Sequence, residues 1–368
     1  MFTLDMLNAA KGDALVITYG DAPCRHIVID GGPRNIYGQV IKPFLGQLGT
    51  PVPIELMVVT HVDDDHIRGI LDLAAEQVRR VDDHQAPLYT VKQLWFNAFD
   101  AVTSQVRLEQ LALAPVAGSV AAQLAGIQEA YLPVVKNILL ESINQGCTLQ
   151  DDARKLGWSL NPQFAQNLVL SGAIRTLEGG LKVTVVTPHA AELENLRKQW
   201  SQYYLTKRSA TLSETVKPAA LLDDSPYNLS SIAFLLEYQG KTMLMTGDAR
   251  GDKVLAGLNE AGLLQQGKLH VDILKLPHHG SDANVDPAFF AAITARHYVI
   301  SANGENGNPD CPTLEMLSAA RPDDDFAIYL SNTVPHVEEF IKCERAKGRN
   351  YGYVTRKAES DLSLQIAL

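Results

Sequence analysis

The sequence is poor in cysteine and in positive charge. Its four cysteines, Cys24, Cys147, Cys311 and Cys343, lie far apart and form no Cys-x-x-Cys pair. We therefore expect free thiols in a reducing compartment rather than a disulfide framework. Lys and Arg number 32 against 42 Asp and Glu, and the formal net charge is −10. This balance argues against binding of nucleic acid through a broad basic surface, although a local groove can still be positive.

Segments that would direct the chain to a membrane are also missing. Residues 1–20 have no basic segment followed by an apolar one, and no stretch approaches the roughly eighteen apolar residues that span a bilayer. We expect a cytoplasmic protein with no membrane partner. With 368 residues, of which 46% are hydrophobic, the chain is long enough for one large domain with an insertion.

Strand-like segments dominate both ends of the chain. Short β-rich segments such as DALVITYG and RHIVIDGG lie near the N-terminus, and the strand rhythm returns from residue 226. Between them, residues 102–146 are rich in Ala, Leu and Gln, which is typical of helices. This pattern predicts an α/β fold, a four-layer αββα sandwich with a helical insertion. The expected organisation is a single domain over 1–368, with a first half at 1–80, the insertion at about 100–175 and a second half at about 180–368.

The first chemically unusual segment follows the apolar segment IELMVVT. His61, Asp63, Asp65 and His66 lie there within six consecutive positions. Carboxylates this close repel one another unless protons or a cation neutralise them. Imidazole and carboxylate are ligands that suit Zn²⁺ or Mn²⁺. The segment is therefore either a solvated loop or half of a metal site.

Two more expected strands end in the same residue types. KTMLM is followed by a Thr-Gly turn and Asp248, and VDILKL is followed by Pro277, His278, His279 and a glycine. Each segment alone has a plain structural interpretation, because Gly-Asp is a common turn and paired histidines can simply pack. Three such strand ends can meet at one edge of a sheet, where active sites of layered folds form. Together they predict a metal centre.

The order of these segments resembles that of the metallo-β-lactamase fold superfamily, which has T-H-x-[HD]-x-D-H, then TGD, then PHHGS. THVDDDH carries Asp63 where most members have their second histidine, and in this it resembles the hydrolase domain of the DNA-uptake channel ComEC and its free-standing relatives. NAAKGDALVI, HIVIDGG, NLSSIAFLLEYQGKTMLMTGD and YVISANGENGNPDCPTLEML are similar to further motifs of that branch. The likeness covers residues 1–75 and about 225–368, and the insertion has no such match.

This resemblance implies a metal-dependent hydrolase that holds one or two divalent ions, with Zn²⁺ or Mn²⁺ expected and Mg²⁺ as an alternative. The implied ligands are His61, Asp63, Asp65, His66, Asp248 and His279, with Asp248 bridging the two ions. A hydroxide activated by the metal would be the nucleophile. Asp65 would orient it and accept its proton, and His278 would donate a proton to the leaving group. Of the paired histidines, His279 fits the ligand position better, because the late ligand of the superfamily usually precedes a glycine.

Departures from the family pattern concern the remaining ligands. Where the family has a third histidine, before the strand at 231–238, this sequence has Asn228, and His189 could substitute from a neighbouring loop. The late His-Pro-His of the family is Asn308-Pro309-Asp310 here. These gaps favour an oxygen-rich site. The other candidates are one residue expected to fix a ligand histidine, Asp30, and three expected to line the pocket, Ser281, Asn303 and Asp310.

The substrate stays open at this point. The likeness to the DNA-uptake hydrolase favours a phosphodiesterase or nuclease, with nucleic acid or a nucleotide as substrate. The acidic net charge and the lack of a Lys/Arg cluster favour instead a small ester, lactone, thioester or amide. A third alternative is a degenerate scaffold that binds a protein partner, or a second copy, through the insertion. The repelling carboxylates at 63–65 argue against it, because a retired site would not need them.

Overall fold

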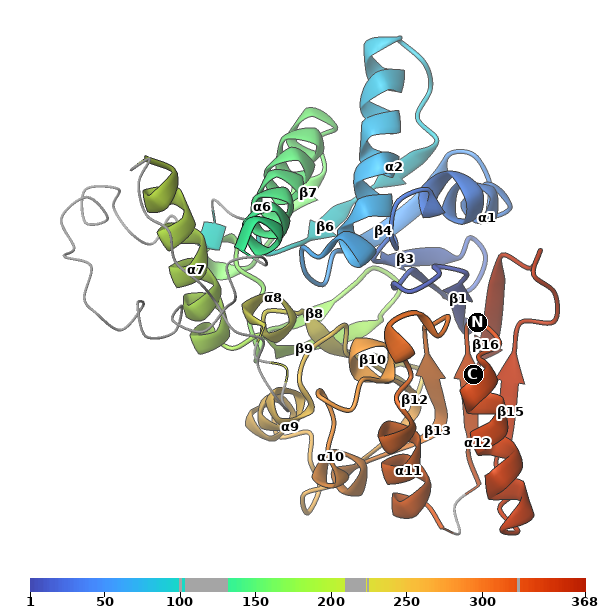
Figure 1. Ribbon diagram of the computed structural model, residues 1–368. Coiled ribbons are helices and arrows are strands. Elements are labelled where there is room, and N and C mark those ends of the chain that lie inside the picture. The colour runs from blue at the N-terminus through green and yellow to red at the C-terminus, as the bar shows by residue number, and fades with distance from the viewer. Residues whose placement is uncertain (99–100, 103–131, 209–222, 224, 323–324) are drawn as a thin grey trace.

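The computed structural model describes residues 1–98, 101–102, 132–208, 223, 225–322 and 325–368. Two eight-stranded sheets pack face to face, and helices cover the outer face of each (Figure 1). The predicted fold class, a four-layer αββα sandwich, is confirmed by this architecture. Within the described residues, no helix combines the length and the apolar character that a bilayer crossing requires.

The first sheet is built from β1 (Phe2–Leu7), β2 (Leu15–Tyr19), β3 (Arg25–Ile29), β4 (Val52–Val58), β5 (Tyr89–Val91), β6 (Gln93–Trp95), β7 (Ser159–Leu160) and β16 (Ser363–Ala367). Its order is β16-β1-β2-β3-β4-β6-β7, with β5 paired to β4. The strands from β16 to β3 pair antiparallel, whereas β3, β4 and β6 pair parallel. The last strand of the chain therefore returns to the first sheet.

The second sheet is built from β8 (Ile174–Thr176), β9 (Lys182–Thr187), β10 (Ala233–Tyr238), β11 (Lys241–Met245), β12 (Leu269–Lys275), β13 (Ile293–Ile300), β14 (Ala327–Leu330) and β15 (Gly352–Thr355). These strands follow one another in order across the sheet. The strands β8 to β11 pair antiparallel, and β11 to β15 pair parallel. The candidate site described below lies at the ends of parallel strands, β3 and β4 in the first sheet and β11 and β12 in the second.

The inner faces of the two sheets form one apolar core. In β1, Phe2, Leu4 and Met6 belong to it, because alternate side chains of a strand point to the same face. From the second sheet, Phe234 and Leu236 of β10 meet them.

Helices α1 (Lys42–Gly46), α2 (Asp64–Asp82) and α6 (Leu132–Lys155) lie on the outer side of the first sheet, after the π-helical turn η1 (Tyr37–Ile41). Ile67 and Ile70 of α2 and Leu149 of α6 share a buried cluster with Val16 and Val28 of the sheet. The apolar face of α2 is therefore its sheet-facing side, as expected of an amphipathic surface helix.

Helices α9 (Gly251–Glu260), α10 (Pro287–Ala292), α11 (Cys311–Ala320) and α12 (Pro335–Ala346) cover the second sheet. Each contributes a buried residue to one cluster with Leu274 of β12: Val254, Phe289, Leu314 and Val337. The remaining helical segments are α7 (Ala190–Arg208), α8 (Pro226–Leu229) and the 3₁₀ turns η2 (Ala165–Asn167), η3 (Pro277–Gly280) and η4 (Glu305–Gly307).

The predicted helical insertion is described only in part. Residues 103–131 lie outside the described residues, and α6 is helical as expected. After α6, β7 pairs with β6 in the first sheet and β8 pairs with β9 in the second. The end of the predicted insertion therefore supplies an edge strand to each sheet. Strands of two and three residues are too short to show the alternation by which strands are recognised.

Candidate metal centre

The three segments singled out in the sequence meet at one edge of the sandwich. Asp30 follows β3, His61 lies just beyond β4, Asp248 follows β11, and His278 and His279 follow β12. The pairs β3/β4 and β11/β12 are parallel, so their carboxyl ends lie on the same side of each sheet. Ligand sites of open α/β sheets form at such carboxyl ends.

The acidic loop after β4 is also the start of a helix. Asp63 is the N-cap of α2, with an extended backbone, but its side chain makes no capping hydrogen bond. Asp64 and Asp65 lie in the first turn, where the positive end of the helix dipole favours negative charge. Asp64 accepts a 2.8 Å hydrogen bond from Gln145 Nε2 of α6. One carboxylate of the three is thus engaged by the insertion, and the other two face the histidines.

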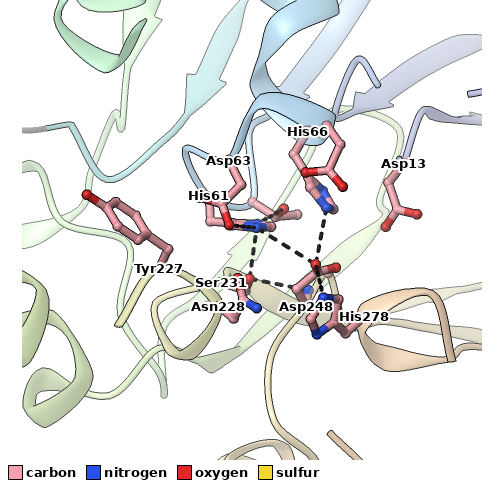
Figure 2. Close-up of polar contacts among 12 residues, drawn as sticks. Asp13, His61, Asp63, His66, Tyr227, Asn228, Ser231, Asp248 and His278 are labelled. Atoms are coloured by element: carbon pink, nitrogen blue, oxygen red, sulfur yellow. Dashed lines mark hydrogen bonds and ion pairs between the residues drawn. The ribbon is translucent and has the colours of Figure 1, made fainter. Parts of the chain in front are cut away.

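The Nε2 atoms of four imidazole rings surround one carboxylate oxygen, Asp248 Oδ2. Figure 2 shows three of these rings, those of His61, His66 and His278. The distances to Asp248 Oδ2 are 3.3 Å from His66, 3.6 Å from His279, 3.7 Å from His278 and 3.9 Å from His61. His61 and His66 lie in the segment that follows β4 of the first sheet, and the other two histidines lie in the turn that follows β12 of the second. The cluster therefore bridges the two halves of the fold.

Two further carboxylates border this cluster. Asp63 Oδ2 lies 3.6 Å from His61 Nε2, and Asp65 Oδ2 lies 3.7 Å from His279 Nε2. Ligand atoms within 4.8 Å of one another occur in the groups His61, His66, Asp248 and Asp65, His66, His279. The structure thus brings together the six residues of the implied ligand set.

The cluster fits a divalent cation because its inner atoms have no other partner. Nε2 of His61, His66 and His279 and Oδ1 of Asp248 are buried and make no hydrogen bond. An unpartnered buried polar atom typically costs about 1–3 kcal/mol. Imidazole nitrogen with carboxylate oxygen is a donor set that suits Zn²⁺ and Mn²⁺. One or two bound cations would give these atoms a partner.

The opposite ring nitrogens are held by fixed acceptors. Nδ1 of His66 donates to Asp30 Oδ2 at 2.9 Å, and Nδ1 of His279 donates to the carbonyl of Ser301 at 2.9 Å. Because a carboxylate or carbonyl can only accept, Nδ1 of each ring carries a proton, and in the neutral ring the Nε2 lone pair faces the cluster. This arrangement orients metal-binding histidines in proteins. The structure places Asp30 beside a predicted ligand, as the sequence led us to expect.

His61 and His278 are held in a similar way. Nδ1 of His61 lies 3.1 Å from Thr60 Oγ1 and 3.2 Å from Ser231 Oγ. Nδ1 of His278 lies 2.7 Å from Asn284 Oδ1. All four rings are therefore fixed from behind, which leaves their Nε2 atoms directed at Asp248.

Three residues of this site have a left-handed backbone. φ is +56° at Asp30, +45° at His278 and +55° at His279. For residues other than glycine, this conformation costs roughly 1–2 kcal/mol each, and it persists where the surroundings impose it. Hydrogen bonds from the Thr60 amide and hydroxyl to the Asp30 carboxylate, at 2.8 Å and 2.7 Å, hold the first of these. Such strain concentrates at functional sites.

The local charges favour positive charge in the cluster. Burial would raise the pKa of Asp248, but the nearby His66, His279 and His278 hold it well below its ordinary value. Burial lowers and the carboxylates of Asp248 and Asp30 raise the pKa of His66, and the net shift is well upward. The pKa of His278 rises to about 9, because Asp248 and Asp223 outweigh its burial. In the absence of a metal ion, protons would supply the neutralising charge.

Sequence reasoning missed several residues behind these rings. Asp223 Oδ2 lies 3.2 Å from His278 Nδ1, and it accepts 2.9 Å and 2.6 Å bonds from the side-chain amides of Asn284 and Asn228. Asp13 lies 3.4 Å from His279 Nδ1. Asp13 left a trace in the sequence, as a charge in the motif NAAKGDALVI.

Two candidates for the missing third histidine have different surroundings. His189 does not join the cluster, because its ring nitrogens lie 3.3 Å from Glu192 and 3.4 Å from Glu260. Asn228 is buried, and its Oδ1 has no hydrogen-bond partner. Its amide nitrogen donates to Asp223, so it is linked to the cluster through the residue that supports His278.

The three predicted pocket residues accept hydrogen bonds from backbone amides of loops, in the case of Asp310 from a loop other than its own. Ser281 Oγ accepts from the Ala283 amide at 3.4 Å, and Asn303 Oδ1 accepts from the Glu305 amide at 3.0 Å. Asp310 Oδ2 accepts from the Asp282 amide at 3.0 Å. These contacts shape the loops beside the cluster, and a role for these residues in a pocket stays a prediction.

Comparison with known proteins gives distant likenesses to solved structures. No protein-family model matches the chain, and no curated protein matches it. Zinc-bound PqqB from Methylobacterium extorquens is similar to it with 11% identity and a TM-score of 0.43, over 100% of both chains. A protein described as a metal-dependent hydrolase from Parabacteroides distasonis ATCC 8503 has 10% identity and a TM-score of 0.35, over 87% of this chain and 89% of its own.

A third solved structure is the metallo-β-lactamase SMB-1 bound to 2-mercaptoethanesulfonate. It has 13% identity and a TM-score of 0.30, over 77% of this chain and 90% of its own. At such scores these likenesses carry no argument about activity. An argument about activity therefore rests on the fold and the His/Asp cluster of this chain.

Proposed function

We propose that this chain is a metal-dependent hydrolase that cleaves phosphodiester bonds. The observation that carries the proposal is the convergence of four imidazole Nε2 atoms on Asp248 Oδ2. Three of those nitrogens are buried without a hydrogen-bond partner. The residues that would hold one or two divalent ions are His61, Asp63, Asp65, His66, Asp248 and His279.

Besides holding the metal, residues of this chain would accept and donate protons. When bound, a divalent cation supplies positive charge that lowers the pKa of water and offsets charge in the transition state. The Asp65 side chain is 27% exposed, so its carboxylate can contact an attacking water and accept the proton. The His278 side chain is 29% exposed, whereas that of His279 is 4% exposed. This contrast favours His279 as the ligand and His278 as the proton donor to the leaving oxygen.

Two arguments favour a phosphodiester over other substrates. The motif order resembles that of the DNA-uptake hydrolase, including Asp63 in place of a histidine. The resulting ligand set is rich in oxygen, which suits the hard cations that serve phosphoryl chemistry. On this proposal the substrate is a nucleic acid or a nucleotide.

The surroundings of the site also support a second candidate, the hydrolysis of a small uncharged ester or lactone. Asp63 and Asp65 border the cluster, and Asp282 and Asp310 lie beside the His278 turn. Burial and the nearby carboxylate of Asp310 raise the pKa of Asp282. Carboxylates at the rim would repel a polyanion and would not hinder a neutral substrate. The insertion at about 100–175 stays a proposed contact for a protein partner or a second copy of the chain.

A substrate panel tests the proposal. The purified full chain would be loaded in turn with Mn²⁺, Zn²⁺ and Mg²⁺ and offered bis(p-nitrophenyl) phosphate, single-stranded DNA and RNA, p-nitrophenyl acetate and a lactone. We expect metal-dependent cleavage of phosphodiesters. Cleavage of only the ester or lactone would establish the second candidate instead, and a metal-loaded protein inert to the whole panel would contradict both.

Adjacent aspartates provide a matched pair of variants. Asp65→Asn should lower the rate by about 100-fold or more, because removal of a general base typically costs 10²–10⁴. Asp64→Asn removes the same charge one residue away, where the carboxylate is bound to Gln145. It should keep most of the activity. Equal loss in the two variants would show that Asp65 has no special role.

A further inference from the structure

A buried ion pair lies behind the cluster and has no part in the chemistry proposed so far. Lys275 Nζ is 2.5 Å from Asp13 Oδ2, and the two side chains are 0% and 1% exposed. Removing two charges from water is costly, and a buried pair is often no more stabilising than apolar residues of similar volume. A wholly buried lysine at the end of an apolar strand therefore calls for a reason other than stability.

The pair joins the turns that form the cluster. Lys275 is the last residue of β12, and its Nζ lies 3.4 Å from the carbonyl of Gly247, next to Asp248. On the other side, the amide of Asp13 donates to the carbonyl of Asp65 at 3.2 Å. One ion pair thus joins the turn between β1 and β2 (called the N-terminal turn below), the turn after β11 that carries Asp248, and the end of β12, which leads into η3.

Asp13 also faces a predicted ligand. Its Oδ1 lies 3.4 Å from His279 Nδ1, is buried, and makes no hydrogen bond. Asp13 thus places a carboxylate behind His279 as Asp30 does behind His66, but at a longer distance and without the hydrogen bond that Asp30 accepts. His279 Nδ1 donates to the carbonyl of Ser301, whose hydroxyl donates to the carbonyl of Gly12 at 2.7 Å. The N-terminal turn therefore supports the His279 ring both directly and through Ser301.

We propose that Asp13, fixed and neutralised by Lys275, is a positioning residue for His279 that strengthens metal binding at Nε2. The inference rests on the proposed metal centre, because it takes His279 as a ligand. The alternative is that the pair only ties the turns together. The two differ in what happens when both charges are removed at once.

The test compares Asp13→Asn, Lys275→Met and the double variant in the full chain. The readouts are Tm of the metal-free protein and Zn²⁺ affinity, measured by competition with a chromophoric chelator. Each single variant leaves one buried charge unpaired and should lower Tm, and the double variant should recover much of that loss. We expect the double variant still to bind Zn²⁺ about 10- to 100-fold more weakly than the wild type, as for other residues behind a metal ligand.

Wild-type Zn²⁺ affinity in the double variant would overturn the inference, since a purely structural pair predicts that result. If the double variant does not fold, Asp13→Asn alone, which keeps the side-chain shape, carries the same expectation for Zn²⁺. A wild-type chain that binds no Zn²⁺ would overturn the metal centre as well, so the two failures are distinguishable.

Two variants calibrate the comparison. Asp30→Asn removes the carboxylate behind His66 and should weaken Zn²⁺ binding to a similar degree. Glu344→Gln alters a buried acid of α12 that pairs with Lys347 and Arg349. It should lower Tm and leave Zn²⁺ affinity unchanged.

Discussion

At the scale of single residues, the candidate site depends on the orientation of its histidine rings. His66 and His279 have their Nδ1 protons fixed by a carboxylate and a carbonyl, so their Nε2 atoms have no freedom to turn away. The sequence could place these residues at strand ends, because apolar runs followed by charge mark such ends. It could not show that Asp223 reaches His278, because that contact joins residues from separate loops with no periodic pattern. Contacts between separate loops can be identified only from the folded structure.

Gly12 provides a residue-scale prediction. A Cβ at this position would lie 2.0 Å from the carbonyl oxygen of Asp65, so Gly12→Ala must push the acidic loop away. We expect a loss of roughly 1–3 kcal/mol in the free energy of unfolding, together with weaker metal binding. Gly46→Ala in α1 is the control, because a Cβ there has no neighbour within 4 Å. Urea denaturation of both variants measures the difference, and equal stability would show that the close approach is not as described.

At the scale of elements, the predicted ligands lie where strands end and where α2 begins. The loop after β4 is at once a predicted ligand segment and the N-terminus of α2, which explains how its carboxylates are tolerated. The strands predicted from apolar, β-rich segments, such as β4 and β12, are present. The return of β16 to β1 was not predictable, because it pairs Thr3 with Ala367 across nearly the whole chain and local sequence carries no record of the partner.

Asp5 ties these two strands together and makes their pairing sensitive to pH. Burial raises its pKa, although Gln365 and Ser363 of β16 donate hydrogen bonds to it. The folded state therefore holds this proton at a pH where the unfolded chain has lost it, and stability falls as pH rises through the folded pKa. Asp5→Asn removes this dependence. The gain in unfolding free energy of the variant over the wild type should be larger at about pH 7 than at about pH 4, and a constant difference would contradict the assignment.

At the scale of the whole molecule, the cluster links two sheets whose apolar core is otherwise their main contact. His61 and His66 lie in the segment that follows a strand of one sheet, and Asp248 and His279 follow strands of the other. A bound ion would therefore cross-link the halves. By mass action, a ligand that binds only the folded state adds about 2.7 kcal/mol at 100 times its Kd.

Metal removal should accordingly destabilise the chain. We expect dialysis against a chelator to lower Tm and Zn²⁺ or Mn²⁺ to restore it, as followed by circular dichroism. His66→Ala should abolish the restoration, because it removes a nitrogen common to both ligand groups. A Tm that is insensitive to chelator and metal would mean that the cluster binds no ion tightly.

The most direct test of the account is elemental analysis of the purified chain after reconstitution with Zn²⁺ or Mn²⁺ and removal of free metal. The account predicts about one or two ions per wild-type chain. It also predicts a large loss in Asp248→Asn, in which the shared oxygen changes, and retention in Asp64→Asn, whose carboxylate is bound to Gln145. Less than about a tenth of an ion per wild-type chain would contradict the central claim, because a site built as described should fill.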